Sequence, residues 1–192
     1  KEVVKQESKE EEPQTEESHV EIPIDFAQLQ AQNPDIYAWI QIDGTNINYP
    51  VAQSATDNEY YLNHTIEGQE GYPGSIYTEN WNTKEFTDFN TVIYGHDMKN
   101  DSMFGTLPDY SSQKYYEANP HWYLLTPTAD YKIELIAGYV THSTSEAYSI
   151  PGTQEEKEKL IQTAFSKSDF TADVEIAENE NLITLSTCSY EY

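Results

Sequence analysis

The chain has 192 residues, of which 37% are hydrophobic, and it carries a formal net charge of −24. This length suits one domain, and the apolar and aromatic content is sufficient for a packed core. Because 34 acidic residues face ten basic ones, all of them Lys, the chain would repel a phosphate backbone, and we expect no nucleic-acid partner.

The first segment, residues 1–19, is acidic and almost free of apolar side chains. Such a segment cannot bury enough surface to offset its ordering entropy, so we expect a disordered tether. The globular domain is placed at residues 20–192. Its first element is a predicted short helix over Phe26–Gln32, with Asp25 as the cap and Asn33-Pro34 as the stop.

The next hundred residues, from Ile36 to Val140, are rich in β-branched and aromatic residues separated by turn-forming residues, which is typical of a mainly β domain. Residues 40–51 alternate between apolar and polar side chains around an Asp43-Gly44 turn. Residues 131–135 alternate in the same way. Both patterns predict half-buried antiparallel strands.

A second helix is predicted just after Pro151-Gly152, where Thr153 and Glu156 have the spacing of a capping box. One face of this helix carries four apolar residues at helical spacing, namely Leu160, Ile161, Ala164 and Phe165. We expect the helix to pack against the sheet. After Asp169 the sequence returns to a strand pattern that ends at Cys188.

Cys188 is the single Cys of the chain, which excludes an intrachain disulfide and a multi-thiolate zinc site. Strand alternation places it on the face of Thr184 and Ser186, whereas Ile183 and Leu185 lie on the other face. A structural Cys more often shares the apolar face, so this register favours a functional thiol. Periodicity alone leaves a buried structural Cys open.

A nucleophilic thiol needs a partner that exchanges protons near neutral pH, and His is the side chain suited to this. His96 follows the predicted strand Thr91–Tyr94 and the turn-forming Gly95, so it sits at a strand end, where catalytic residues are common. The remaining histidines are in settings more typical of structural or solvated side chains: His19, His64, His121 and His142. The adjacent Asp97 is not expected to face the His96 ring.

Two sequence signatures resemble those of the sortases. Thr184–Cys188 (TLSTC) is similar to their TLxTC motif, and Tyr94–Met98 (YGHDM), followed by Ser102–Gly105 (SMFG), is similar to their histidine segment. The likeness covers about residues 20–192. A helix at the start and a helix inserted before the Cys strand are similar to the class B group.

The resemblance implies a closed eight-stranded β-barrel and a cysteine transpeptidase. The acidic residues show no EF-hand spacing, and we expect no metal or cofactor. Cys188 would attack the carbonyl after the Thr of a C-terminal sorting signal and form a thioacyl enzyme, and His96 would act as general acid and base. The acceptor would be an amine of a peptidoglycan precursor or a pilin. The class B pattern implies these substrate contacts: Asn58, Leu62, Tyr94, Tyr148 and Ser186.

The resemblance further implies an Asn-Pro-x-Thr-like sorting motif and a place on the extracellular face of a Gram-positive membrane, anchored by a segment that is not in this chain. Sortases also use an Arg shortly after the Cys, and this sequence has none. We therefore expect that the final strand is missing from this chain and that the chain is inactive or impaired. Two alternatives stay open, a Cys–His endopeptidase or hydrolase and a non-catalytic surface-binding domain.

Overall fold

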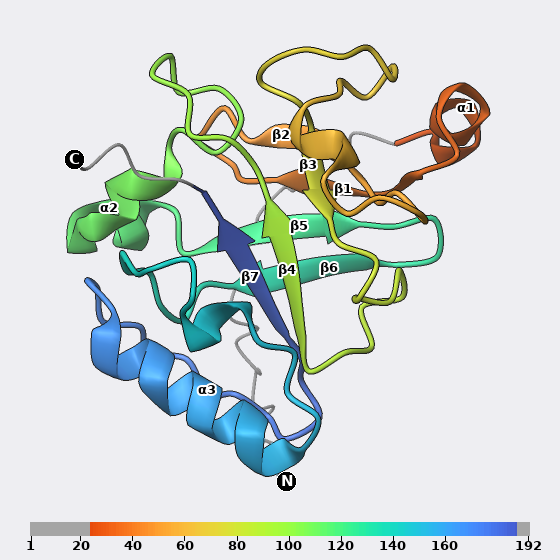
Figure 1. The fold of residues 1–192 in the computed structure, drawn as a ribbon. Coiled ribbons are helices and arrows are strands. Elements are labelled where there is room, and N and C mark those ends of the chain that lie inside the picture. The colour runs from red at the N-terminus through yellow and green to blue at the C-terminus, as the bar shows by residue number, and fades with distance from the viewer. Residues whose placement is uncertain (1–23, 188–192) are drawn as a thin grey trace, which may run out of the picture.

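The computed structural model describes residues 24–187, which form a mainly β fold around one curled seven-stranded sheet (Figure 1). The order of the strands across the sheet is β6-β5-β1-β2-β3-β4-β7, so β6 and β7 are its two edges within the described residues. The strands are β1 (Ile36–Gln41), β2 (Asn48–Ala52), β3 (Ile76–Thr78), β4 (Asn90–Tyr94), β5 (His121–Leu125), β6 (Asp130–Glu134) and β7 (Leu182–Ser186). The expected mainly β architecture is confirmed.

The first two strands form the predicted antiparallel hairpin around Gly44. Ile40 pairs with Tyr49, and the turn is closed by the Ile42 amide, which donates to the Ile47 carbonyl at 2.9 Å. Gly44 has a φ of 75°, a left-handed conformation that side chains with a Cβ adopt rarely, which is why a Gly is suited to this turn. The predicted strand at residues 131–135 is observed as β6, one residue earlier.

The helices are α1 (Phe26–Gln32), α2 (Gln113–Ala118) and α3 (Gln154–Lys167), with 3-10 turns η1 (Tyr60–Leu62), η2 (Leu107–Ser111) and η3 (Glu146–Tyr148). Both predicted helices are confirmed with their caps, because Asp25 accepts from the Gln28 amide at 2.9 Å and Thr153 from the Glu156 amide at 3.2 Å. None of the helices among the described residues is long and apolar enough to cross a bilayer.

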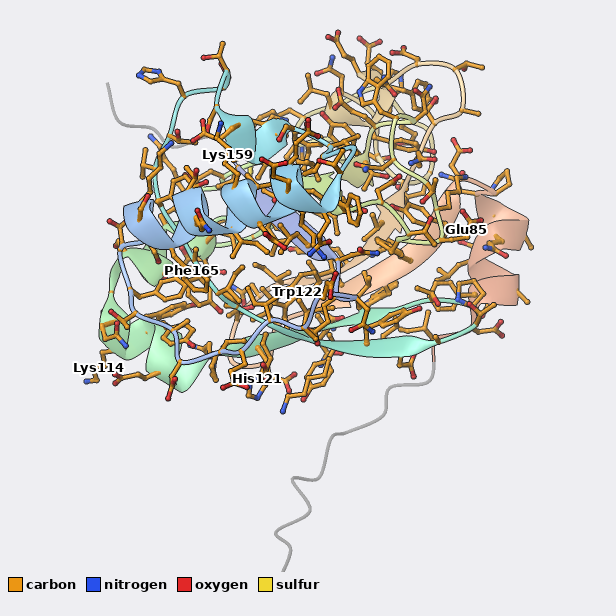
Figure 2. All side chains as sticks on the ribbon, turned by 90° about the horizontal axis from the view of Figure 1, so that it is seen from below. Glu85, Lys114, His121, Trp122, Lys159 and Phe165 are labelled. Carbon is orange, nitrogen blue, oxygen red and sulfur yellow. The ribbon has the colours of Figure 1, made fainter. Side chains whose placement is uncertain are left out.

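The buried face of α3 differs from the face that the apolar spacing predicts. Leu160 is buried as expected, but Phe165 is 40% exposed, and Lys157 is 1% exposed. The reason is that Lys157 donates to two backbone carbonyls of the segment that precedes β7, which turns this side of the helix inward. In Figure 2, α3 and the β5–β6 hairpin lie on opposite sides of a layer of packed side chains.

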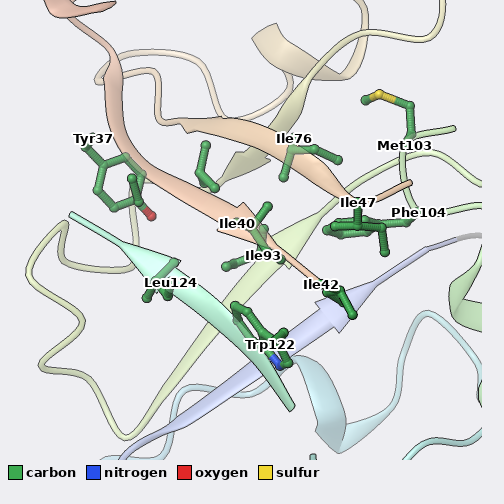
Figure 3. Close-up of a cluster of buried hydrophobic side chains, with 12 residues drawn as sticks. Tyr37, Ile40, Ile42, Ile47, Ile76, Ile93, Met103, Phe104, Trp122 and Leu124 are labelled. Carbon is green, nitrogen blue, oxygen red and sulfur yellow. The ribbon is translucent and has the colours of Figure 1, made fainter. Parts of the chain in front are cut away.

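The main core lies on the concave side of the curled sheet and is built from aliphatic and aromatic side chains of most strands (Figure 3). Trp122 of β5 is 2% exposed, and Phe104, from the loop after β4, is fully buried. Ile183 and Leu185 of β7 pack against this cluster. The predicted alternation of β7 is therefore confirmed, and its other face carries Thr184 and Ser186.

The predicted tether at residues 1–19, the domain start at Val20 and the candidate nucleophile Cys188 all lie outside the described residues.

Candidate active site

The candidate site is built on the parallel pair of β4 and β7, which lie side by side in Figure 1. Asn90 pairs with Leu182 and Tyr94 with Ser186, so the register offset is constant along the pair. The Gly95 amide then donates to the Ser186 carbonyl at 3.0 Å, which extends the pairing by one bond beyond β4. His96 is the next residue of the chain, so this bond holds the backbone directly before it.

Gly95 lets the backbone before His96 lie against the core. A Cβ placed on Gly95 would collide with the Ile76 side chain and would lie 2.7 Å from the ring of Phe104. Because both of these side chains are buried in a packed core, neither can move away cheaply. A larger residue at position 95 would therefore displace the His96 segment.

The His96 ring is partly buried and has two neighbours from other loops. Its Nε2 lies 3.2 Å from the Leu62 carbonyl, and its ring centroid lies 5.0 Å from that of Tyr72. A carbonyl can only accept, so this contact requires a proton on Nε2 and leaves Nδ1 as the acceptor of a neutral ring. The Leu62 carbonyl therefore restrains the orientation of the ring.

Two residues that were predicted to bind substrate, Asn58 and Leu62, lie just before η1 and at its end, and only Leu62 contacts His96. Leu62 is 37% exposed and contacts His96 through its carbonyl, as described above. Asn58 is occupied elsewhere, since its side-chain oxygen accepts from the Asn80 amide at 2.7 Å. Asn58 thus fixes the loop after β3, and the structure does not bring it to His96 through a hydrogen bond.

Three predicted residues from distant parts of the chain meet beside the strand pair. The Tyr94 and Tyr148 rings are stacked with centroids 6.3 Å apart and an angle of 4° between their planes. The Ser186 hydroxyl donates to the Tyr148 hydroxyl at 3.3 Å. These contacts join β4, η3 and β7 into one partly buried aromatic wall, which we define as Tyr94, Tyr148 and Ser186.

The Tyr94 phenol is held by a carboxylate that the sequence did not single out. Its hydroxyl donates to Glu79 Oε2 at 3.0 Å, and its ring stacks on Tyr77. Burial first, and then the negative charge of Glu79, raise the pKa of Tyr94 well above its usual value. Tyr94 is therefore a neutral phenol whose hydroxyl is directed to Glu79.

Asp97 is built into the loop that follows His96. It forms an isolated antiparallel bridge with Met103, and the backbone of His96 accepts from the Phe104 amide at 2.9 Å. Burial, together with the nearby Asp101, raises the pKa of the Asp97 carboxyl. These bonds shape the His96 loop.

Sequence reasoning missed Tyr72, Tyr77 and Glu79. Their positions depend on loop packing, and the short β3 carries no motif that marks them. An aromatic residue before Pro73 and an acidic residue just after a buried strand are the weak signals that could have suggested two of them.

Comparison with known proteins identifies the family of this chain. Sortase B of Listeria monocytogenes is 36% identical over 174 residues, which cover 89% of this chain and 70% of that protein. Sortase B of Staphylococcus aureus is 32% identical over 170 residues, covering 87% and 68%. A structure of a Staphylococcus aureus sortase B–substrate complex superimposes with a TM-score of 0.81 at 30% identity, covering 87% of this chain and 77% of that one.

A scan against protein-family models found no match. The curled sheet of this chain is nevertheless shared with the solved sortase structures, so the fold defines a sortase. Within that class, the chain belongs to the sortase B family. The resemblance seen in the sequence is thereby confirmed.

Proposed function

We propose that this protein is a cysteine transpeptidase in which Cys188 is the nucleophile and His96 the general acid and base. The observation that carries the proposal is the register of β4 and β7. Each residue of β4 pairs with the residue 92 positions later in β7, and 92 is also the separation of His96 and Cys188 in the sequence. Continuing this register would set the two side chains next to each other, on strands about 4.8 Å apart.

The same register supports a shared face for the two groups. Tyr94 and Ser186 are paired, and both contact Tyr148, so residues at these positions point to the same side of the sheet. His96 and Cys188 each follow two residues later in the sequence, and continuation of both strands in the extended conformation would put their side chains on this same face. A thiol and an imidazole placed in this way can exchange a proton.

The proposed reaction has two acyl-transfer steps. The Cys188 thiolate attacks the carbonyl carbon of the Thr residue in a sorting peptide, a C–S bond forms, and the C–N bond to the next residue breaks. His96 first takes the proton of the Cys188 thiol, and it then gives this proton to the departing amine and returns to the neutral ring. An acceptor amine then attacks the thioester, His96 takes a proton from it, and the new amide leaves the Cys188 thiolate free.

The aromatic wall and Leu62 supply the proposed peptide-binding surface. One of the solved relatives is a sortase B–substrate complex, and another is a complex of sortase B with triglycine. By analogy we assign to this chain a sorting peptide with an Asn-Pro-x-Thr-like motif and a peptidoglycan or pilin amine as acceptor. The site of action would be the outer surface of a Gram-positive cell, where surface proteins are anchored.

Amine diversion tests the proposal against a Cys–His hydrolase. A labelled Asn-Pro-x-Thr peptide is incubated with the protein, with and without triglycine, and the products are separated by mass. A transpeptidase yields the triglycine amide at the expense of the free acid, whereas a hydrolase yields acid at any amine concentration. Because the sequence has no Arg, we expect slow turnover, and the products are followed over long reaction times. Absence of any cleavage even then would favour the non-catalytic binding domain and contradict the proposal.

Variants of two histidines sharpen this test. His96→Ala should abolish product formation, because no other group is proposed for proton transfer. His121→Gln is the matched control, since His121 begins β5, and three strands separate β5 from β4 in the sheet. Equal loss of product in both variants would show that the effect is not specific to His96.

A further inference from the structure

Asn90, the first residue of β4, is a fully buried side chain with every hydrogen-bonding group occupied. Its Nδ2 donates to the Ala147 carbonyl at 3.1 Å and to the Ser149 carbonyl at 2.9 Å. Its Oδ1 accepts from the Thr184 hydroxyl at 2.9 Å. A primary amide offers two N–H groups and one carbonyl, so the side chain is satisfied without water.

The orientation of this amide follows from its partners. Backbone carbonyls only accept, so the NH₂ end must face Ala147 and Ser149, and the oxygen must face the Thr184 hydroxyl. An Asp of the same shape would direct an acceptor at two acceptors. A Leu would leave both carbonyls without this donor. The position therefore requires an amide for chemical reasons.

The two carbonyls that Asn90 holds belong to the residues on either side of Tyr148. Fixing both of them fixes the backbone from which the Tyr148 ring projects. That ring stacks on Tyr94 and its hydroxyl binds Ser186, so the two neighbours of Tyr148 in the wall come from β4 and β7. Asn90 thus ties η3 to the same two strands.

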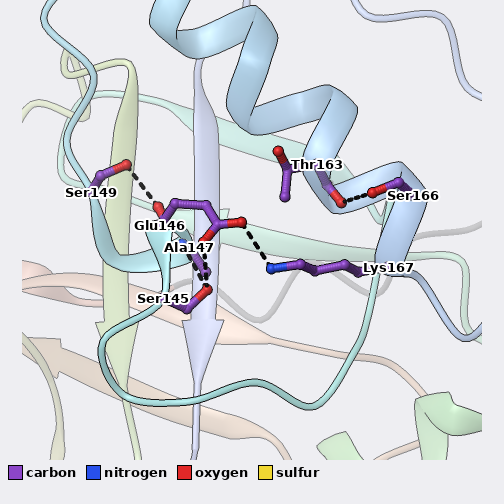
Figure 4. Close-up of polar contacts among 7 residues, drawn as sticks. All are labelled: Ser145, Glu146, Ala147, Ser149, Thr163, Ser166 and Lys167. Atoms are coloured by element: carbon purple, nitrogen blue, oxygen red, sulfur yellow. Dashed lines mark hydrogen bonds and ion pairs between the residues drawn. The ribbon is translucent and has the colours of Figure 1, made fainter.

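The contacts of η3 that Figure 4 draws are local or exposed. The Ser145 hydroxyl accepts from the Ala147 amide at 3.3 Å, and the Ser149 hydroxyl donates to the Glu146 carbonyl at 2.7 Å. The ion pair of Glu146 with Lys167 of α3 measures 2.8 Å, but both side chains are exposed, and such pairs contribute little. These bonds shape the turn without setting its distance from the strand pair.

We propose that Asn90 is a positioning residue that sets Tyr148 against the β4–β7 pair and thereby fixes the width of the peptide-binding surface. It would act through Tyr148 and would not itself contact the peptide. The placement of η3 follows from the structure alone, whereas the effect on peptide binding rests on the proposed transpeptidase function. The test therefore has one readout for each.

The first readout is hydrogen exchange followed by mass spectrometry in Asn90→Asp. We expect the backbone amides of residues 145–149 to exchange about tenfold faster. Loss of these buried hydrogen bonds should raise the equilibrium constant for local opening by about that factor. Exchange in β1 and β5 should stay as in the unaltered protein. Ile42→Val, a core substitution distant from η3 in sequence, serves as a control for general loss of stability.

A second pair of variants covers the case in which Asn90→Asp does not fold. Thr184→Val removes the donor that holds the Asn90 oxygen, and Thr184→Ser keeps it. We expect faster exchange at residues 145–149 in the Val variant and normal exchange in the Ser variant. Unchanged exchange in Thr184→Val, or equal acceleration in η3 and in the core strands, would overturn the positioning role.

The second readout is the steady-state kinetics of peptide cleavage. A misplaced Tyr148 should raise KM about tenfold while kcat stays within about threefold, because the wall is proposed to bind peptide and carries neither the reacting thiol nor the imidazole. An equal fall in kcat, with KM unchanged, would contradict the inference. If the unaltered protein cleaves no peptide, the proposed function fails, and hydrogen exchange alone decides the role of Asn90.

Discussion

Lys157 offers a quantitative test of how the segment before β7 is held. Its ammonium group is buried and donates to the Glu178 carbonyl at 2.6 Å and to the Glu180 carbonyl at 2.8 Å, and it lies 5.1 Å from the Phe89 ring centroid. Two residues later, the Leu182 amide binds the Phe89 carbonyl and begins the β4–β7 pair. Lys157→Met keeps most of the aliphatic stem and removes the charge.

The expected cost follows from three terms. Each carbonyl that loses its donor costs about 1–3 kcal/mol if no water replaces the lost bond. The side chains of residues 178–180 are exposed, so water can reach part of this segment and reduce the total cost. Relief of the buried ammonium's desolvation offsets a further part. We therefore expect a net loss of about 2 kcal/mol, the order of a broken buried network.

The assay is thermal unfolding followed by circular dichroism. For a domain of this size, a loss of about 2 kcal/mol lowers Tm by about 4–8 °C. Lys159→Met is the matched control, because Lys159 lies on the same helix and is exposed, and its Tm should change by less than about 2 °C. Equal shifts in the two variants, or no shift in Lys157→Met, would show that the bonds of Lys157 do not stabilise the segment before β7.

Three further predictions concern Gly95, Tyr61 and Glu79. Gly95→Ala should lower both Tm and peptide cleavage, because its Cβ collides with the Ile76 side chain, and a variant with normal cleavage would show that the His96 segment tolerates displacement. Burial raises the pKa of Tyr61 from 10.0 to about 12, so between these values the folded state keeps a proton that the unfolded state loses. The free energy of unfolding should therefore fall between about pH 10 and pH 12. Urea titrations at these pH values should show a shallower fall for Tyr61→Phe. Glu79→Gln should lower the pKa of Tyr94, as followed by NMR of a ring-labelled Tyr, and an unchanged pKa would mean that burial alone raises it.

Local features of the fold could be predicted from the sequence. The caps of α1 and α3, the turn at Gly44 and the two faces of β7 depend on residues within a few positions of each other. Local hydrogen bonding and alternation leave a direct trace in the order of residue types. His96 was found in the same way, as a His at the end of a short strand.

Features that depend on distant contacts could not be predicted. The parallel partner of β4, which is β7, is 92 residues away, and nothing in the pattern of either strand specifies a parallel pairing with the other. The burial of Lys157 was not predicted, because a Lys is rarely buried unless it finds partners, and here the partners are carbonyls of another segment. The role proposed for Asn90 likewise depends on residues 57 and 59 positions away.

Some of the predicted site residues are found together in the structure, and one is not. The resemblance to sortases pointed to Tyr94, Tyr148 and Ser186, and the structure brings these three together. The Asn58 side-chain oxygen instead accepts a hydrogen bond from the backbone amide of Asn80, in the loop after β3. Their roles in peptide binding stay a prediction, as does the nucleophilic role of Cys188.

If Cys188 forms a covalent acyl intermediate with the help of His96, the intermediate can be detected by intact-mass measurement. The protein is mixed with an Asn-Pro-x-Thr peptide without any acceptor amine, quenched in acid and weighed. We expect an added mass equal to that of the N-terminal fragment acid less one water, mapped to Cys188, reduced in His96→Ala and absent in Cys188→Ala. An adduct that persists in Cys188→Ala, or peptide cleavage without any adduct on the thiol, would contradict this mechanism.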